Sequence, residues 1–320
     1  MVQGNYSVMA SETMDPDVCE QCQSIRPATP PIDSCCGSGC AVCVYDIHDQ
    51  EIQLWKKTCK RKHGAEEIQI EDNTTVMDLM DYRYYTLQSI VPVCANTAVY
   101  RFMLPPGRKL DLSIAKHIIL RGIHNGKVIT RQYTPISSPH DAGFFEVLIK
   151  LYPGGDMSQY IKQWKIGDEV EWRGPFGSFT YQPNEGHYMI AIAAGTGITP
   201  IIQVMRHIIE NEEDETVFRL LYTCRNYDEI LLRETLNELA LYWNITIIFN
   251  LTQSLAGSHP TEYGEIIQYG RFTQKRLSKE VAASMGRPVR VLVCGTRSFE
   301  NDMITFLKES GVQANSIEKF

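Results

Sequence analysis

The sequence predicts an antiparallel β-barrel domain followed by an α/β domain with a doubly wound parallel sheet, preceded by a small cysteine-rich module. Short segments rich in β-branched and aromatic residues fill 79–182. Turn sequences such as PPG and PGGD separate them, as is typical of a barrel. From residue 185 onwards, buried-strand patterns alternate with amphipathic helix patterns, which indicates parallel strands joined by helices. Six of the ten cysteines lie near the N-terminus.

These changes of pattern place the domain boundaries near residues 78 and 184. We expect a cysteine-rich module and tether at 1–78, the barrel at 79–184 and the α/β domain at 185–320. Residues 1–78 offer little apolar periodicity, which is why we interpret part of them as a tether. The expected elements include one strand over 127–137 and one helix over 229–243.

Length and composition exclude several classes of protein. The chain has 320 residues with 43% hydrophobic and 22% charged residues, which is ordinary for a globular protein of two domains. A net charge of -7 argues against nucleic acid or an anionic membrane surface as the main partner. No apolar stretch approaches the length of a transmembrane helix, and no signal peptide is evident. We expect an intracellular protein, cytoplasmic by default and with an organelle left open.

The segment RQYTPIS at 131–137 is the first chemical motif. Arg131 and Tyr133 alternate on a strand, so their side chains share one face that suits a flavin. The guanidinium fork matches a pyrophosphate, and Thr134 and Ser137 offer short hydrogen-bond donors. Taken alone, the segment favours an ordinary barrel strand that ends at a proline turn.

Two glycine-rich turns suggest phosphate sites. PGGDMSQYI at 153–161 places Ser158 near a helix start, although alone it favours a plain helix N-cap. AAGTGITP at 193–200 lies between a buried strand and a helix, where Gly195 and Gly197 can cradle a phosphate. Ligands of open α/β sheets bind at the carboxyl ends of such strands.

A third glycine turn, in VLVCGTRSF at 291–299, again ends a strand before a helix. Cys294 is therefore expected at the carboxyl edge of the sheet, near a nicotinamide. A buried structural thiol explains this cysteine equally well.

The order and spacing of these motifs are more specific than any one of them. RxYTxxS, GGxMS, GPFG, GTGITP and CG follow one another over about 80–320 in an arrangement that resembles the ferredoxin-reductase superfamily, specifically NADH–cytochrome b5 reductases. The resemblance implies an FAD-dependent enzyme that takes hydride from NADH. It also implies transfer of electrons to a one-electron acceptor protein such as cytochrome b5.

The resemblance also assigns roles to residues. It implies that Arg131 pairs with the FAD pyrophosphate and that Tyr133 and Thr134 contact the flavin. We expect Thr134 or nearby backbone to donate to flavin N5, and Cys294 to stand at the site of hydride transfer. The other expected cofactor positions are Gln132, Ser137, Leu148, Lys150, Gly155, Met157, Ser158, Gly195, Thr196, Gly197, Thr199, Glu229 and Gly295.

Three departures from the family pattern stand out. Gln132 replaces the usual proline of RxYT, and CGTRSF replaces CGPPPM. Asp156 stands where cytochrome b5 reductases usually carry a lysine that faces acidic cytochrome b5. An acidic residue there, with the net charge of -7, disfavours cytochrome b5 as the acceptor.

The choice of nucleotide depends on residues that follow the second strand of the α/β domain. Asp228 and Glu229 favour the ribose diol of NADH, whereas Arg225 suits the 2′-phosphate of NADPH. We favour NADH. The alternative within the same fold is an NADPH-linked ferredoxin- or quinone-type reductase.

The N-terminal cysteines form a second group of candidates. Cys19 and Cys22 make a CxxC, and the zinc or iron–sulfur ligands expected with them are Cys35, Cys36, Cys40 and Cys43. A redox disulfide and reduced structural thiols are the alternatives. The segment resembles the N-terminal module of oxidoreductase-like proteins. A non-catalytic metal-binding or interaction protein is the rival from another functional class. The cysteines outside this cluster are expected to be scattered reduced thiols: Cys59, Cys94, Cys224 and Cys294.

Overall fold

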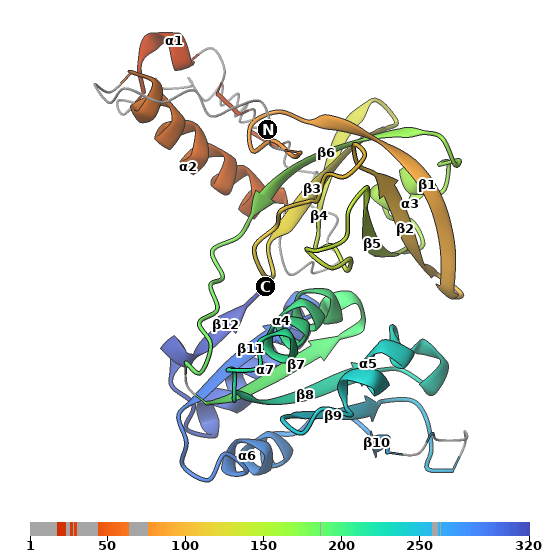
Figure 1. Cartoon of the computed structure of the whole chain (residues 1–320), viewed down its shortest axis with the longest axis vertical. Helices are drawn as coiled ribbons and strands as arrows, with labels where there is room; N and C mark the ends of the chain where they lie inside the picture. The colour runs from red at the N-terminus through yellow and green to blue at the C-terminus, as the bar shows by residue number, and fades with distance from the viewer. Residues whose placement is uncertain are drawn as a thin grey trace, which may run out of the picture. The chain divides into compact units, whose positions relative to one another are not determined.

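The computed structural model describes residues 18–23, 26–27, 29–30, 44–63, 76–185, 187–257, 262 and 264–320. The chain divides into two compact units (Figure 1). Unit 1 comprises residues 1–35 and 43–73, and unit 2 comprises 36–42 and 74–320.

Unit 1 contains two helices, α1 at Glu20–Gln23 and α2 at Val44–His63. The long helix α2 was not expected from the sequence, which offers little apolar periodicity in this region. Its buried residues Ile47, Trp55 and Cys59 are spaced by multiples of four, which places them on one helical face. Charged and polar residues fill most positions between them, and they hide this sparse pattern from a sequence search.

The first domain of unit 2 is the predicted antiparallel barrel. Its six strands pair in the order β4-β3-β6-β1-β2-β5, and an isolated bridge between Pro135 and Val147 joins the end of β4 to β5. The strand expected over 127–137 ends earlier, because Pro135 has no N–H group with which to continue the ladder. The strands and the single helix are β1 Arg83–Cys94, β2 Thr97–Met103, β3 His117–His124, β4 Lys127–Tyr133, β5 Phe144–Lys150, α3 Asp156–Ile161 and β6 Glu169–Phe176.

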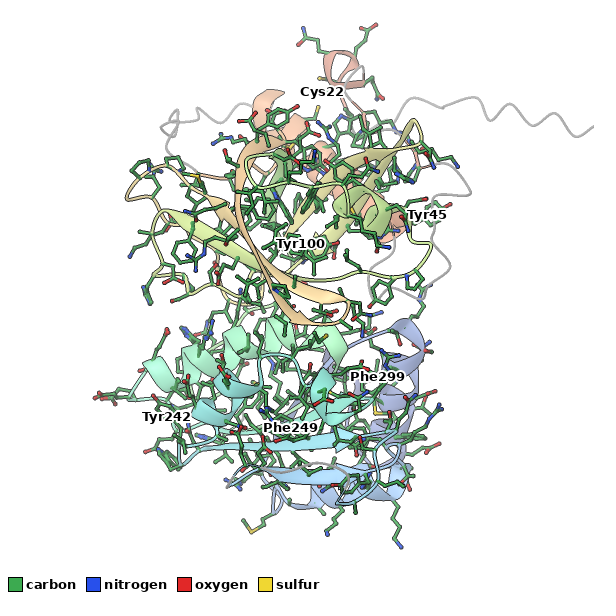
Figure 2. All side chains as sticks on the ribbon, turned by 90° about the vertical axis from the view of Figure 1, so that its right-hand side faces the viewer. Cys22, Tyr45, Tyr100, Tyr242, Phe249 and Phe299 are labelled. Carbon is green, nitrogen blue, oxygen red and sulfur yellow. The ribbon has the colours of Figure 1, made fainter. Side chains whose placement is uncertain are left out.

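Aromatic side chains fill the barrel. The ring of Phe102 stacks on Phe145 at 5.2 Å and meets Trp172 edge-on at the same distance. All three side chains are fully buried. Tyr100, labelled in Figure 2, adds an edge-on contact with Trp164 at 5.7 Å. Such pairs add to the hydrophobic stabilisation of burial, so the barrel is a rigid support for its rim.

The second domain is the predicted doubly wound fold. Its strands are all parallel and run in the order β10-β9-β8-β7-β11-β12, so the direction of winding reverses between β7 and β11. The elements are β7 Tyr188–Ala194, η2 Gly195–Gly197, α4 Ile198–Glu210, β8 Val217–Cys224, η3 Tyr227–Glu229, α5 Arg233–Leu239, β9 Ile245–Leu251, β10 Ile266–Tyr269, α6 Gln274–Ala282, β11 Val289–Cys294, α7 Arg297–Glu309, η4 Ala314–Ser316 and β12 Ile317–Lys319.

Both faces of this sheet are buried. Along β7, Ala191 belongs to the core cluster on one face, while Ile190 and Ile192 belong to the cluster on the other. Phe249 of β9, labelled in Figure 2, is also buried. Parallel strands covered on both faces read as continuous apolar runs, as the β7 sequence YMIAIAA does.

The helix expected over 229–243 is wrong in extent. Leu232 has φ of 56°, in the left-handed region, and therefore separates η3 from the short helix α5. Two strands, β10 and β12, were not predicted because they have only four and three residues at the edges of the sheet. Among the described residues, no helix combines the length and apolarity needed to cross a membrane.

Helix α4 attaches the barrel to the α/β domain. The Gln203 side chain accepts a hydrogen bond from Ala115 N–H at 2.7 Å and donates to the Pro135 carbonyl. Arg206 donates to the Ile136 carbonyl one residue further along. The end of the RQYTPIS segment is therefore fixed against the same helix that begins at the GTG turn.

Candidate functional site

The end of β4 carries the first predicted site residues. Arg131 and Tyr133 lie opposite Leu120 and Ile118 on β3, and alternate residues of a strand share one face, as expected. The Tyr133 ring contacts Trp172 edge-on at 5.7 Å. Arg131 donates to the neighbouring Thr130 carbonyl at 2.7 Å and has no carboxylate partner in the described part of the chain.

One buried polar atom on this strand lacks a partner among the described residues. The Gln132 amide nitrogen is buried without a hydrogen bond to any described residue. The Ser137 hydroxyl accepts from Glu146 N–H at 3.1 Å, and Thr134 is half-buried just beyond the strand. A half-buried polar row with an uncompensated cation fits a large anionic cofactor such as FAD, because its pyrophosphate neutralises the guanidinium.

The GGDMS loop packs beside the same strand, since α3 contacts both β3 and β4. The Ser158 hydroxyl accepts a hydrogen bond from Tyr152 N–H at 2.9 Å, so it fixes the loop's own conformation. Met157 is buried in the barrel core, and Gly155 is the N-cap of α3. The Met157 side chain therefore supports the barrel from within, which leaves its backbone for any cofactor contact.

Two glycine turns meet at the point where the sheet winding reverses. A Cβ atom on Gly197 would lie 2.4 Å from the Cys294 carbonyl oxygen, so only glycine permits this approach. Gly195 has φ of 54°, and its carbonyl accepts from the Tyr222 hydroxyl at 2.9 Å. The expected residues Gly195, Thr196, Gly197, Cys294 and Gly295 are thus brought together at the carboxyl edge of the sheet.

The start of α4 suits a phosphate group. Its N-cap, Gly197, has no side chain that could satisfy the first-turn N–H groups. The Thr199 hydroxyl donates to the Thr196 carbonyl at 3.1 Å, which holds the turn from the helix side. Ile198 N–H already donates to the Gly195 carbonyl, so the N–H groups that suit a dinucleotide pyrophosphate are those of the η2 turn that precedes α4.

Cys294 is buried with 8% of its surface exposed. Burial, and secondly the nearby Glu300 carboxyl, raise the pKa of its thiol above the ordinary value. The side chain is therefore a neutral, polarisable group near neutral pH and lacks the thiolate of a nucleophilic cysteine.

Glu300 is a site residue that the sequence analysis missed. It is fully buried on α7, its Oε1 accepts from Gly295 N–H at 3.1 Å, and Oε2 has no partner among the described residues. Burial raises its pKa to about 7, while the Gly295 hydrogen bond, Lys319 and Arg297 act in the opposite direction. Its spacing from Met303 and Leu307 on one helical face was the available signal.

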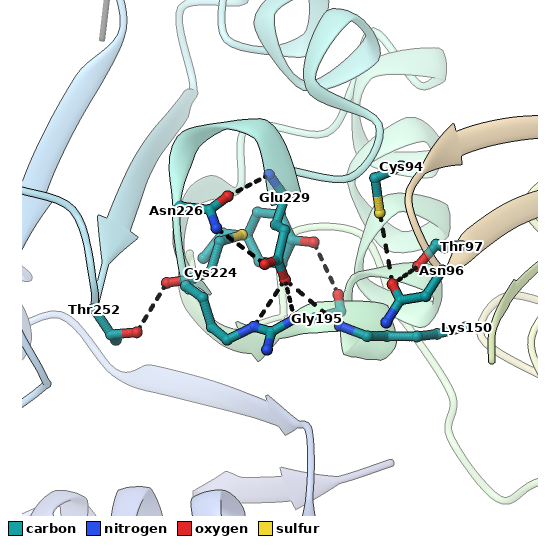
Figure 3. A network of polar contacts seen from close by, with 11 residues as sticks. Cys94, Asn96, Thr97, Lys150, Gly195, Cys224, Asn226, Glu229 and Thr252 are labelled. Atoms are coloured by element: carbon teal, nitrogen blue, oxygen red, sulfur yellow. Dashed lines mark hydrogen bonds and ion pairs between the residues drawn. The ribbon is translucent and has the colours of Figure 1, made fainter. Parts of the chain in front are cut away.

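Glu229 is the centre of a polar network that joins the two domains of unit 2 (Figure 3). Its Oε2 lies 2.8 Å from Arg225 Nη2 and 3.7 Å from Lys150 Nζ, and Asn226 donates to Oε1 at 3.0 Å. Lys150 comes from the end of β5, next to buried Leu148 on the same strand. The structure therefore brings two predicted cofactor residues, Lys150 and Glu229, into contact.

The predicted metal ligands separate into two groups. Cys35, Cys36, Cys40 and Cys43 lie outside the described residues. Cys19 and Cys22 converge instead with Cys59, so the expectation that Cys59 stands apart from this cluster is wrong. Sequence distance concealed the third thiol, because 40 residues separate Cys19 from Cys59.

Comparison with protein families identifies three segments. Residues 84–181 match the model of an oxidoreductase FAD-binding domain, and residues 191–305 match that of an oxidoreductase NAD-binding domain. Residues 23–63 match the model of an oxidoreductase-like protein, N-terminal.

Two relatives match nearly the whole chain. The NADH-cytochrome b5 reductase-like proteins of Mus musculus and Homo sapiens are 33% and 34% identical to it over 312 residues. These alignments cover 96% and 97% of this chain and 98% and 99% of the relatives. Among solved structures, the cytochrome b5 reductase domain of Ulva prolifera nitrate reductase gives a TM-score of 0.67 at 24% identity, covering 77% of this chain and all of that domain. This structural similarity supports the assignment of the fold alone.

The raised pKa of Glu300 predicts a pH-dependent contribution to stability. The folded state binds this proton more tightly than the unfolded state, whose carboxyl titrates near 4.5. The free energy of unfolding should therefore fall as pH rises from about 4.5 to about 7. The Glu300→Gln variant keeps an acceptor for Gly295 but cannot ionise. Between pH 5 and 8, the free energy of unfolding of the natural protein should fall by about 1–3 kcal/mol more than that of this variant. Urea unfolding at both pH values measures this.

Glu309→Gln is the matched control, because Glu309 is exposed on the same helix. Equal pH dependence in the natural protein and Glu300→Gln would contradict the assignment.

Proposed function

We propose that this chain, which belongs to the NADH-cytochrome b5 reductase-like family, carries electrons from NADH through FAD to a one-electron acceptor protein. It is an FAD-dependent oxidoreductase with an FAD-binding and an NAD-binding domain. One observation carries the proposal: α4 begins at the GTG turn and also holds the end of the RQYTPIS segment through Gln203. The proposed boundaries are 79–184 for the FAD domain and 185–320 for the NADH domain.

On the barrel side, the chain's own residues bind and orient FAD. Arg131, which pairs with no carboxylate in the described ranges, offers its guanidinium to the pyrophosphate. Tyr133 is held against Trp172 and presents a fixed aromatic edge to the flavin. Thr134 lies just beyond the strand, where its hydroxyl or backbone can donate to the flavin ring. When bound, FAD supplies a group that accepts a hydride and releases electrons singly.

In the α/β domain, the chain's own residues bind NADH. The first turn of α4 and the glycines of the GTG turn receive the pyrophosphate, and Glu229 receives the ribose diol. Cys294 gives the nicotinamide a neutral, buried neighbour, which keeps water from the place of transfer. Catalysis of this kind requires orientation and exclusion of water more than acid–base chemistry.

The acceptor is proposed to meet the protein near α3. Asp156 is exposed in the first turn of that helix, where the resemblance places a lysine facing acidic cytochrome b5. Like charge slows encounter and weakens docking. We therefore propose an acceptor with a less acidic docking face than cytochrome b5.

The Arg131 guanidinium, which has no carboxylate partner among the described residues, predicts an effect on FAD binding. Arg131→Ala should weaken FAD binding by about 10- to 100-fold, because a charged hydrogen bond contributes roughly 1.5–3 kcal/mol. Arg131→Lys should recover only part of this affinity, since lysine lacks the planar fork. Flavin fluorescence titration of the apoprotein measures the dissociation constant. Lys127→Ala, on the same strand, is the control, and equal FAD affinity in Arg131→Ala would refute the role.

The charge of Asp156 predicts acceptor preference. Asp156→Lys should raise kcat/KM for cytochrome b5 by about 5-fold or more at low ionic strength, with an effect that fades as salt is added. Reduction of ferricyanide, a small acceptor, by saturating NADH should change much less. If the natural protein already reduces cytochrome b5 as fast as the variant at low salt, this account of acceptor choice fails.

The contacts of Glu229 predict nucleotide preference. Glu229→Gln should reduce the NADH-to-NADPH ratio of kcat/KM by about 10- to 100-fold, because the ribose loses a charged acceptor and Arg225 is released for a 2′-phosphate. Initial rates with both nucleotides measure the ratio. Glu234→Gln, at an exposed acid in the first turn of α5, should leave it unchanged. Two results together would favour an NADPH-linked reductase. The ratio would be unchanged in Glu229→Gln, and the single substitution Arg225→Ala would abolish the use of NADPH.

A further inference from the structure

Three cysteine thiols converge within unit 1. Cys19 and Cys22 belong to the CxxC at α1, and Cys59 comes from α2. Their sulfur atoms all lie within 4.8 Å of one another, and none forms a disulfide. Cys22, labelled in Figure 2, and Cys59 are buried, while Cys19 is half-buried. Two segments distant in sequence thus present sulfur to a common point.

The spacing of these sulfurs suits a metal ion. Zinc binds thiolates at about 2.3 Å, so two thiolates in a tetrahedral site lie about 3.8 Å apart. Sulfurs within 4.8 Å of one another reach such a site through small side-chain movements. A CxxC supplies two adjacent ligands and a distant cysteine the third, which is a common division in zinc sites.

Backbone hydrogen bonds already organise the cluster. Cys19 N–H donates to Cys59 Sγ at 3.2 Å, which orients that sulfur toward the CxxC. The Trp55 indole donates to the Cys22 carbonyl at 2.8 Å, and so holds the CxxC turn against α2. The first contact joins two members of the cluster, and the second fixes the CxxC from a residue outside it.

The core of this region supplies an independent reason for a metal. Its buried hydrophobic cluster among the described residues consists of Val18, Cys22, Trp55 and Cys59, and α1 is a single turn. A core this small gives little hydrophobic stabilisation, and small folds of this kind are commonly held together by disulfides or metal ions. Half of these core residues are thiols, and no disulfide joins them.

We propose that Cys19, Cys22 and Cys59 bind one zinc ion that fastens the CxxC turn to α2. Each thiol that becomes a ligand releases its proton to solvent, and no electron is transferred. Zinc is favoured over an iron–sulfur cluster because clusters are usually held by four cysteines, whereas the three thiols that converge among the described residues leave zinc one position for another ligand. The site is structural and separate from the FAD and NADH chemistry.

The test uses the purified full-length holoprotein. Metal analysis should find about one zinc per chain, and cobalt replacement should give the absorption of tetrahedral cobalt thiolate at red wavelengths, where oxidised flavin does not absorb. Cys59→Ser should weaken zinc binding by more than about 100-fold, since loss of an outer-shell partner alone costs 10- to 100-fold. Cys59→His should restore binding, because imidazole also coordinates zinc. Cys94→Ser in the barrel is the control.

A second readout reports structure. Hydrogen exchange in the peptide 44–63 should accelerate in Cys59→Ser and after chelation, while NADH–ferricyanide activity stays unchanged in both. Full zinc content in Cys59→Ser would overturn the proposal. So would iron with inorganic sulfide, or a disulfide between Cys19 and Cys22 in the protein as isolated. Natural protein that holds zinc but has no NADH–ferricyanide activity would instead count against the proposed function.

Discussion

The close approach of two glycine turns is the constraint on which the site depends. Gly197 passes so near the Cys294 carbonyl that no side chain fits between them, and this happens where the sheet reverses its winding. Helix α4 begins at one of these turns and, six residues later, holds Pro135 through Gln203. The position of the glycine turns therefore fixes the end of the RQYTPIS segment, so the proposed nucleotide and flavin sites share one support.

Charge in this support is arranged for binding. In the proposed function, Arg131 and the turn that leads into α4 offer positive potential to two pyrophosphates, while Cys294 is neutral because it is buried. Glu300 donates no charge to this region until it ionises, because burial raises the pKa of its carboxyl to about 7. In mildly acidic conditions, little negative charge therefore lies next to the proposed place of hydride transfer. The Glu229 carboxylate lies after strand β8, and Arg225 and Lys150 balance its charge.

The sequence predicted what depends on short-range pattern. Alternation placed Arg131 and Tyr133 on one face, and the glycine turns followed buried strands as expected. Features that depend on tertiary contacts were not predicted from the sequence. Leu232 adopts a left-handed conformation that helix propensity does not foresee, and Met157 turns into the barrel core. Cys59 meets its partners across 40 residues, and Glu300 resembles an ordinary first-turn acid until its burial is known.

The most direct measurement is the absorption spectrum of the purified protein during anaerobic titration with NADH. The account predicts a yellow protein whose flavin band bleaches with about one NADH per FAD, and bleaches far less readily when Gly197 is replaced by alanine. A colourless protein that takes up no FAD, or a flavin band that NADH leaves unchanged, would contradict the claim that the two turns hold a nicotinamide against a barrel-bound flavin.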